Sequence, residues 1–269
     1  MFTEKAIIEL KDMIHRIRAF IRCTPESDDL FKYIHSHAKF LNERWGIWNE
    51  GGFLFGINKE CTCMKIFFNA QDITTEGEEH GWQRNITYEE FKQVLYLLES
   101  MGLNLSDTSV SYIEVGATLQ TDKEPKSYFN CLGRLPYFTK QTTYKSTTLY
   151  YNTPKTMNKS IIFYDKRKQI ENKREARYKD QEHGIKGQYL RYELRMLKKS
   201  IREDKRIKSI STLQDLLDRN KYECLINRWQ DYYLKIKKTK ERPQRESELQ
   251  GKITKAVQAH LKNTQIINR

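Results

Sequence analysis

The chain of 269 residues carries 48 lysine or arginine residues against 35 aspartate or glutamate residues, which gives a formal net charge of +13. This length allows one large domain or two small ones with a substantial hydrophobic core. No apolar run approaches the roughly 20 residues needed to span a bilayer, and no secretory signal pattern is present, so we expect no membrane association. The five cysteines are odd in number and scattered, which favours reduced thiols and a cytoplasmic location.

The positive charge is unevenly distributed. Residues 1–158 carry 18 Lys and Arg against 20 Asp and Glu, whereas residues 159–269 carry 30 against 15. Such an excess in one part of a chain favours an anionic partner, and nucleic acid is the usual one. A solvated basic tail would have the same composition, so charge alone leaves both interpretations open.

The N-terminal residues show helical spacing. Between residues 3 and 22, apolar side chains recur every three or four positions and predict an amphipathic helix. These positions are Ile7, Leu10, Ile14, Ile17 and Ile21. A second short helix is expected over residues 31–45, so that residues 1–46 would form a helical N-terminal extension.

Two strands and a helix are predicted next. Gly51-Gly52 leads into the strand-like segments GFLFGI and CTCMKIFFN. Thr87-Tyr-Glu-Glu90 has the form of a capping box and predicts a helix that runs to about Ser100, where Met101-Gly102 ends it. Further along, a short helix is expected over residues 127–132 and a strand over residues 142–152.

Three segments alternate apolar and polar residues with a period of two, which is typical of strands with one buried face. They span residues 110–119, 160–166 and 189–197. The predicted buried positions are Ile113, Val115, Ala117, Leu119, Ile161, Phe163, Leu190, Tyr192, Leu194 and Met196. The predicted polar positions are Tyr112, Glu114, Gly116, Thr118, Tyr164, Lys166, Arg191, Glu193 and Arg195.

The polar positions suggest chemistry. If the three strands share a sheet, Glu114, Glu193 and Tyr164 emerge on the same side, and two carboxylates that face one point suit a hard cation such as Mg²⁺ or Mn²⁺. Gly116 leaves room beside Glu114 for another backbone. A tyrosine, a lysine and a carboxylate flanked by arginines suit attack on a phosphodiester. The alternative is a sheet with one wet face, on which charged side chains pair across strands for modest stabilisation.

The remaining segments complete the predicted architecture. Residues 169–186 are highly charged and indicate a helical hairpin or a loop, and helices are expected over residues 211–219 and 221–235. We therefore predict an α+β fold with a mostly antiparallel sheet and flanking helices. Its parts would be the extension at 1–46, a catalytic domain at 47–236 and a basic, polar C-terminal appendage at 237–269.

Several of these segments resemble a known family. Y-I-E-V-G-A-T-L, S-I-I-F-Y-D-K-R-K-Q and Y-L-R-Y-E-L-R-M-L-K-K, followed by S-I-S-T-L-Q-D-L-L, are similar to segments of phage and plasmid replication initiation proteins of the rolling-circle type. The segments K-I-F-F-N and G-W-Q-R-N-I-T-Y-E-E-F add to the likeness, which covers residues 51–235. The filamentous-phage replication initiator is similar more remotely. The resemblance implies a nicking–joining endonuclease domain related to the His-hydrophobe-His superfamily.

The resemblance also implies roles for individual residues. The tyrosine that attacks DNA in this family corresponds to Tyr164, and the lysine two residues later corresponds to Lys166. The carboxylates that assist the metal, Mg²⁺ or Mn²⁺, correspond to Glu114 and Glu193, and His80 is the candidate nitrogen ligand. The residues expected to contact DNA are Arg191, Arg195, Lys198, Lys199 and Tyr112.

The expected substrate is single-stranded or hairpin origin DNA in the cytoplasm of a host cell. The sequence contains no G-x-x-x-x-G-K-[ST] motif, so a host helicase would unwind the DNA and a polymerase would extend it. The chain departs from the family where Cys63-Met64-Lys65-Ile66 lacks a histidine and where Thr118 replaces an asparagine. These departures keep a second interpretation open, in which the protein binds DNA on the same fold but cuts it poorly or not at all.

Overall fold

The computed structural model describes residues 14–22, 29–40, 44–78, 81–142, 147–154, 158–173, 187–239 and 243–262. Within these ranges ten strands form one antiparallel sheet in the order β2-β3-β4-β5-β1-β6-β10-β9-β8-β7. The strands are β1 Ile14–Arg22, β2 Lys39–Phe40, β3 Trp45–Glu50, β4 Phe53–Asn58, β5 Cys63–Asn69, β6 Ser109–Thr121, β7 Thr139–Thr142, β8 Thr148–Asn152, β9 Lys159–Asp165 and β10 Gln188–Leu197.

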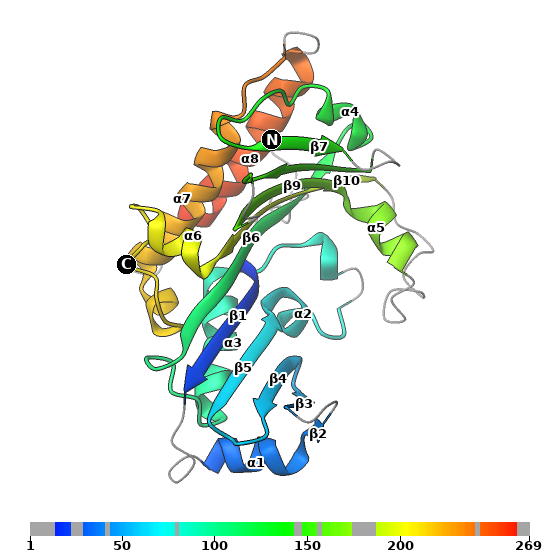
Figure 1. The fold of residues 1–269 in the computed structure, drawn as a ribbon. Coiled ribbons are helices and arrows are strands. Elements are labelled where there is room, and N and C mark those ends of the chain that lie inside the picture. Colours follow the sequence, from blue (N-terminus) through cyan, green and yellow to red (C-terminus); the bar gives the residue numbers. More distant parts are fainter. Residues whose placement is uncertain are drawn as a thin grey trace.

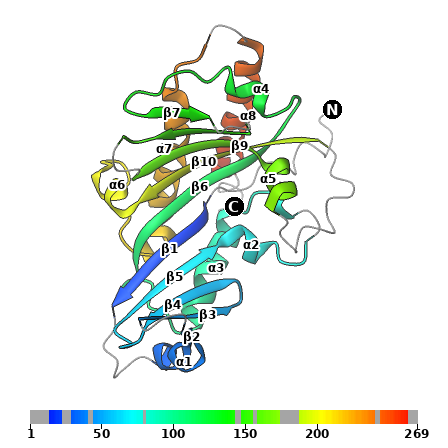
Figure 2. The ribbon, with the colours of Figure 1, turned by 45° about the vertical axis from the view of Figure 1, so that its right-hand side comes forward.

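The long helices α3, α7 and α8 cover one face of this curved sheet. The described helices are α1 Asp29–His37, α2 Ala70–Thr74, α3 Tyr88–Ser100, α4 Lys126–Phe129, α5 Lys166–Lys173, α6 Lys198–Glu203, α7 Arg219–Lys235 and α8 Pro243–Lys262, with short 3₁₀ turns at Gly81–Gln83 and Gln214–Leu217. Figures 1 and 2 place α3 behind β1, β4 and β5, and α7 and α8 behind the other half of the sheet. In both views no described helix crosses in front of the middle of β1, β4 and β5.

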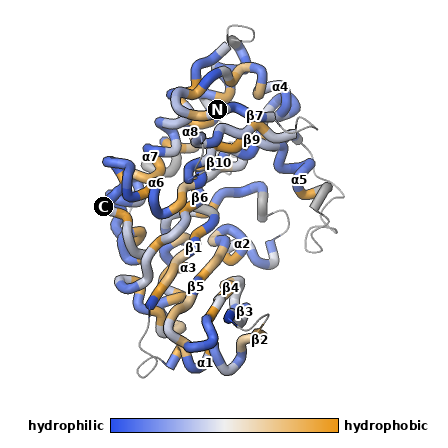
Figure 3. Tube along the Cα trace, in the orientation of Figure 1, coloured by the Kyte–Doolittle hydropathy of each residue, from blue (hydrophilic) through white to orange (hydrophobic). Residues whose placement is uncertain are grey.

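The hydrophobic core lies between the sheet and these helices. It includes Phe55, Ile66 and Phe91 in one half of the molecule, and Tyr192 and Trp229 in the other. Hydrophobic residues accordingly dominate β5 and its neighbours in Figure 3, whereas α5 and α6 are largely hydrophilic. The α+β class and the antiparallel sheet predicted from the sequence are confirmed.

The long strand β6 joins the two halves of the sheet. Its first residues pair with β1 and its later residues pair with β10, so the two partners overlap only around its middle. Glu114 lies in this overlap, where its register partners are Arg16 on β1 and Arg195 on β10. The central carboxylate is therefore flanked by an arginine on each side.

The strands β6, β9 and β10 and the face on which each apolar residue lies are confirmed. Ile113, Phe163 and Leu194 are completely buried on the helix side. The expectation of a single buried face is wrong, because Glu114, Tyr164 and Glu193 on the opposite face are buried as well. The predicted capping box is also present, because the Thr87 side chain accepts from the Glu90 backbone and the Glu90 side chain accepts from the Thr87 backbone. The resulting helix α3 ends at Met101, as expected.

The prediction of a helical N-terminal extension is wrong for residues 14–22, which form β1 near the centre of the sheet. Their apolar residues fit both periods, but Ile17, Ala19 and Ile21 also recur at every second position, with arginines at three of the four intervening and flanking positions and Phe20 at the fourth. As a strand this segment buries all three between β5 and β6, which a surface helix would not do. The second predicted helix exists but is shorter, at Asp29–His37.

The C-terminal segment is also more structured than predicted. Residues 243–262 form α8, whose Leu249, Ile253 and Val257 are buried in the core cluster. Tyr128 donates a hydrogen bond to Glu248 at 2.7 Å, which ties α4 to this helix. The expectation of a polar appendage is therefore wrong for these residues. None of the described helices is both long enough and apolar enough to cross a membrane.

Candidate active site

Three neighbouring strands bring the predicted catalytic residues together on the face opposite the core helices. In the register of the sheet, Arg195 lies opposite Glu114, Glu193 lies opposite Gly116, and Arg191 lies opposite Tyr164. Residues directly opposite each other in antiparallel strands have side chains on the same face. The prediction that Glu114, Glu193 and Tyr164 share one face is confirmed.

Glu193 is the centre of the hydrogen bonds at this site. The Tyr164 hydroxyl donates to Glu193 Oε1 at 2.6 Å, and Arg191 Nε lies 3.2 Å from the same oxygen. Arg195 Nη2 donates to the other oxygen, Oε2, at 2.7 Å. Gly116 makes space for this arrangement, because a Cβ atom there would lie 2.8 Å from both Glu193 Cγ and the Tyr192 carbonyl oxygen. The predicted close approach of another backbone at Gly116 is thus confirmed, and the side chain of Glu193 uses the same space.

Glu114 is held from both neighbouring strands. Tyr112 donates its hydroxyl to Glu114 Oε2 at 2.8 Å, and Arg195 Nε lies 2.9 Å from that oxygen, although not aligned for a hydrogen bond. Arg16 Nε is 3.9 Å from Oε1. Arg195 therefore bridges the two carboxylates. We call this group the arginine–carboxylate cluster; it consists of Glu114, Glu193, Arg16, Arg191, Arg195, Tyr112 and Tyr164.

Burial and charge give the two carboxyl groups opposite pKa shifts. Burial alone would raise the pKa of Glu193, but Arg195 and Arg191 outweigh it, and the pKa lies well below its ordinary value. Burial and the neighbouring Glu193 raise the pKa of Glu114. Burial and Glu193 also raise the pKa of Tyr164 well above 10, so this phenol is protonated at neutral pH.

Lys166, the first residue of α5, adds a further cation. Its Nζ donates to Gln169 Oε1 at 3.0 Å. Burial lowers its pKa to about 8, with the positive charge of Arg191 adding to the decrease and Glu193 opposing it. Lys166 is therefore within electrostatic reach of the cluster, and its amine titrates near neutral pH.

The described carboxylates do not fit a divalent cation as they are arranged. Both oxygens of Glu193 and one of Glu114 already accept from guanidinium or phenol groups. Among the described residues, no group of three His, Cys, Asp or Glu side chains is placed to hold a metal ion. A cation here would also lie beside three guanidinium groups. His80, the predicted nitrogen ligand, lies outside the described residues.

The predicted DNA contacts divide into two groups. Arg191, Arg195 and Tyr112 belong to the cluster, as shown above. Lys198 and Lys199 begin α6 instead, beyond the end of β10. Lys198 donates to Ser109 Oγ at 3.1 Å, whereas the exposed Lys199 lies 3.9 Å from Glu203.

Three residues of the site escaped the sequence analysis. Arg16 falls in the segment predicted as a helix, although small or aliphatic residues at every second position, Ile17, Ala19 and Ile21, also fit a strand. Thr118, noted only as a departure from the family, accepts from Arg191 Nη1 at 2.9 Å. The buried Asn85 accepts from the Thr118 backbone N–H at 2.9 Å and donates to its carbonyl at 3.3 Å. Nothing in the local sequence pattern marks Asn85.

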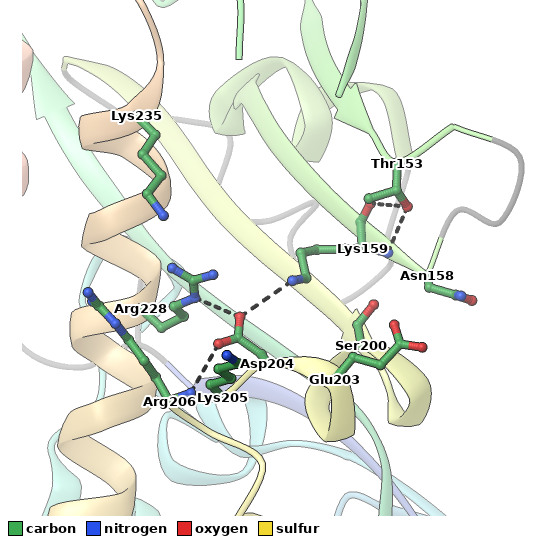
Figure 4. A pocket seen from close by; sticks show the side chains of 10 residues that line it. All are labelled: Thr153, Asn158, Lys159, Ser200, Glu203, Asp204, Lys205, Arg206, Arg228 and Lys235. Carbon is green, nitrogen blue, oxygen red and sulfur yellow. Dashed lines mark hydrogen bonds and ion pairs between the residues drawn. The ribbon is translucent and has the colours of Figure 1, made fainter. Parts of the chain in front are cut away.

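A second charged group lies on the helix side of the sheet, beside a cavity of about 450 Å³ (Figure 4). At its centre, Asp204 Oδ2 lies 2.6 Å from Arg228 Nε and 3.5 Å from Lys159 Nζ. Both cations also donate to the Tyr232 hydroxyl. We call Asp204, Lys159, Arg228 and Tyr232 the Asp204 group. It joins β9 and α7 to the turn after α6.

Comparison with known proteins adds no relative. The sequence matches no model of a protein family, and no curated protein sequence matches it.

Proposed function

We propose that this protein is a DNA-nicking and -joining endonuclease that initiates replication, with Tyr164 as its nucleophile. The observation that carries the proposal is the Tyr164 hydroxyl, 2.6 Å from Glu193 on a face where three arginines converge. A phenol beside a carboxylate and several guanidinium groups supplies a nucleophile, a proton acceptor and phosphate ligands in one place.

The proposed reaction exchanges one phosphodiester for another. The Tyr164 oxygen attacks the phosphorus in line, the bond from phosphorus to the 3′-oxygen breaks, and the leaving 3′-oxygen takes up a proton. The products are a 5′-phosphotyrosyl link and a free 3′-hydroxyl. Because the new ester is similar in energy to the old one, the reaction can reverse and rejoin the strand.

Phosphate binding would activate the nucleophile. Arg16 and Arg195 are about one third exposed, at 35% and 32%, whereas Tyr164 is 6% exposed. A phosphate that draws Arg195 away from Glu193 makes Glu193 a stronger base toward the Tyr164 hydroxyl, because a cation that lowered its pKa has moved. The same guanidinium then stabilises charge that develops on the phosphoryl oxygens.

Lys166 completes the proposed machinery. With a pKa of about 8, its amine gives up and takes up protons near neutral pH, as a general acid or base requires. It would also provide positive charge next to the reacting phosphate. No step of this scheme passes through a metal ion, and a requirement for Mg²⁺ or Mn²⁺ stays a prediction from the family resemblance.

The proposed substrate is single-stranded or hairpin origin DNA. The 3′-hydroxyl left by nicking is a primer for a polymerase, and a host helicase would unwind the duplex. The excess of positive charge after residue 158 supports a polyanionic partner.

A second candidate function is DNA binding without cleavage. It is favoured by the closed state of the cluster, in which the carboxylates are neutralised by arginines and Tyr164 is protonated. Such a protein would use the same arginines to bind DNA and recruit a replisome or regulate its own gene.

A covalent-trapping experiment separates the two functions. Purified protein is mixed with labelled single-stranded oligonucleotides that tile its own replicon, with and without Mg²⁺ or Mn²⁺, and resolved on a denaturing gel. We expect label to migrate with the wild-type protein and with Tyr232→Phe, a matched variant in the Asp204 group, but not with Tyr164→Phe. DNA retention on a native gel without any covalent species would instead establish the binding protein.

A further inference from the structure

A row of aromatic and basic side chains crosses the sheet next to the arginine–carboxylate cluster. On four adjacent strands, Tyr112, Arg18, Phe67 and Leu54 are successive register partners. Lys65 occupies the next row, and Trp45 lies beside it. We call this set the open-face platform; it consists of Tyr112, Arg18, Phe67, Leu54, Lys65 and Trp45.

The cations of the platform lie on its rings. The Arg18 guanidinium carbon is 4.9 Å from the Tyr112 ring centroid and 5.2 Å from the Phe67 centroid. Lys65 Nζ is 3.9 Å from the Trp45 centroid. These distances are within the range of cation–π contacts. Aromatic rings and positive charges therefore alternate along the platform.

The platform is open to solvent although much of it is apolar. Arg18 and Lys65 are exposed, Phe67 and Trp45 are partly exposed, and the aliphatic Leu54 is 37% exposed. The core helices pack on the opposite face of the same strands, as Figures 1 and 2 show for α3. A contiguous apolar surface on the uncovered face of a sheet is typical of an interaction site.

The platform carries positive charge and its two register rows contain no carboxylate, which favours an anionic partner. The register row through Phe67 runs from Leu197 to Asn49, and the row through Lys65 runs from Ser109 to Lys39; neither contains a carboxylate. A partner therefore meets ring faces and positive charge without an acidic group. Single-stranded nucleic acid has the complementary chemistry, with flat bases and a negative backbone.

The β6 end of the platform meets both the cluster and a further lysine. The Tyr112 hydroxyl donates to Glu114 and so links the platform to the cluster. Lys198, which follows the register partner of Tyr112, donates to Ser109 Oγ at 3.1 Å on the same strand. The platform thus adjoins the cluster that contains Tyr164.

We propose that the open-face platform binds the single-stranded DNA that flanks the scissile phosphate, with bases stacked on Phe67, Tyr112 and Trp45 and phosphates on Arg18 and Lys65. This inference depends on the proposed function of the cluster and adds the surface that presents its substrate. The four strands span about 15 Å, a length that accommodates several bases stacked 3.4 Å apart.

The test measures DNA binding in a Tyr164→Phe background, so that no covalent product forms. Fluorescence anisotropy with a labelled single-stranded oligonucleotide compares Phe67→Ala with Tyr96→Ala, which removes an exposed ring from α3 on the opposite face. We expect Phe67→Ala to bind about 5- to 100-fold more weakly and Tyr96→Ala to bind as the parent does. Phe67→Leu, which keeps an apolar side chain but loses the ring, should resemble Phe67→Ala.

Two further measurements separate stacking from charge. An oligonucleotide with abasic sites should bind the parent weakly and lose the difference between parent and Phe67→Ala. Lys65→Gln should lower the slope of log affinity against log salt by about 0.7, whereas Lys92→Gln, which removes a similar cation–π contact on α3, should not. Circular dichroism melts confirm that each variant is folded.

The possible results distinguish the platform from the nicking function. If Phe67→Ala and Phe67→Leu bind single strands as tightly as the parent, the platform proposal is overturned, even if wild-type protein forms the Tyr164 adduct. If they bind weakly but wild-type protein forms no adduct on any replicon oligonucleotide, the platform stands and nicking fails. Equal binding to duplex and single strands with no effect of abasic sites would also overturn stacking.

Discussion

The arginine–carboxylate cluster and the Asp204 group are built from the same residue types but differ in their surroundings. Each combines a buried carboxylate with arginine and tyrosine side chains, and a lysine lies within the Asp204 group and near the cluster. In the cluster, the Tyr164 hydroxyl donates a hydrogen bond to Glu193 at 2.6 Å. In the Asp204 group, the Tyr232 hydroxyl accepts from Lys159 and Arg228 and donates to Asp204 Oδ2 at 3.4 Å. Both tyrosines therefore face a carboxylate, but the hydrogen bond of Tyr164 is much the shorter.

The two groups also differ in what covers them. The Asp204 group lies among α6, α7 and β9, where its ion pairs fasten helices to the sheet (Figure 4). The cluster lies on the opposite face, where two of its arginines reach solvent. Composition alone thus does not make a catalytic site: the two groups differ in the length of the hydrogen bond from phenol to carboxylate and in the access of a phosphate. The following predictions test this contrast.

The largest effect on stability is expected in the Asp204 group. Asp204→Asn removes the carboxylate shared by Lys159 and Arg228, each 13% exposed, and leaves Arg228 only the longer contact with Asp231 at 3.7 Å. Breaking one side of a buried ion pair costs about 3–5 kcal/mol, which urea unfolding will measure. Asp231→Asn, at a more exposed carboxylate, should cost less than about 1 kcal/mol.

Loss of the Asp204 carboxylate should lower stability but should not change the rate of adduct formation at Tyr164. Folded Asp204→Asn protein, measured well below its midpoint, should form the Tyr164 adduct at the parent rate. An Asp204→Asn variant that keeps its stability but loses the adduct would reverse the roles assigned to the two groups. Burial opposes ionisation of Asp204, but Arg228 and Lys159 lower its pKa below 3.8. The ionised Asp204 side chain therefore contributes its full stabilisation of the folded state above pH 3.8, and this stabilisation is lost as the pH falls through the lower pKa of the folded state.

The second effect concerns the geometry of the cluster. In Gly116→Ala, the new Cβ would meet Glu193 Cγ and the Tyr192 carbonyl oxygen, both at 2.8 Å, and displace the partner of Tyr164. We expect adduct formation to slow by about 100-fold, the size of effect that a displacement of about 1 Å produces. Gly251→Ala is the matched control, because nothing lies within 4 Å of a Cβ there. Equal rates for both variants would show that the position of Glu193 does not matter.

The sequence predicted those parts of the site that depend on strand periodicity. A period of two, once recognised, determines which residues share a face, and so Glu114, Glu193 and Tyr164 were placed together correctly. It failed for β1, because Ile14, Ile17 and Ile21 fit helical spacing as well. Only pairing with β5 and β6, which lie far apart in the chain, decides between the two structures.

Other features depend on contacts that no local pattern contains. The ion pairs between arginines and the two carboxylates depend on contacts distant in the chain. Arg16 lies 98 positions before Glu114, and Arg195 reaches both carboxylates through the register of β6 with β10. The burial of α8 likewise depends on α7 and β6, although its sequence is largely polar. The open-face platform joins β3, β4, β5, β1 and β6, and its rings become neighbours only through strand order.

A smaller effect follows from the lysines. Lys159 lies 3.5 Å from the Asp204 carboxylate, whereas Lys166 donates to the neutral amide of Gln169. Burial lowers the pKa of Lys166 from 10.5 to about 8, so its protonated form destabilises the folded state. Allowing for its partial exposure, Lys166→Gln should stabilise the protein by about 1–2 kcal/mol at pH 7.

The pH dependence of this gain has a definite sign. Below pH 8 both the folded and unfolded states carry the Lys166 proton, and the full penalty applies. Between pH 8 and 10.5 the folded state alone releases it, so wild-type stability rises and the advantage of Lys166→Gln disappears. Urea unfolding at pH 7 and pH 10 measures this, with the exposed Lys199→Gln as a control that should show no such trend. If the stability difference between Lys166→Gln and wild type were the same at pH 7 and pH 10, Lys166 would not be destabilised by burial of its charge.

The smallest expected effect concerns metal binding. Arg195 bridges Glu114 and Glu193, so in the DNA-free protein both carboxylates are neutralised before a cation arrives. Manganese binding, followed by the loss of the free-Mn²⁺ resonance signal, should therefore be as weak in wild type as in Glu114→Gln. Arg195→Gln removes the bridge and should increase Mn²⁺ affinity severalfold, because two carboxylates can then share the ion. Arg206→Gln, which removes an exposed arginine lining the cavity beside the Asp204 group, should leave it unchanged. Tight Mn²⁺ binding to the wild-type, DNA-free protein would show that the arginines yield to a metal, and the cluster would then be a cation site rather than a phosphate site guarded by its own arginines.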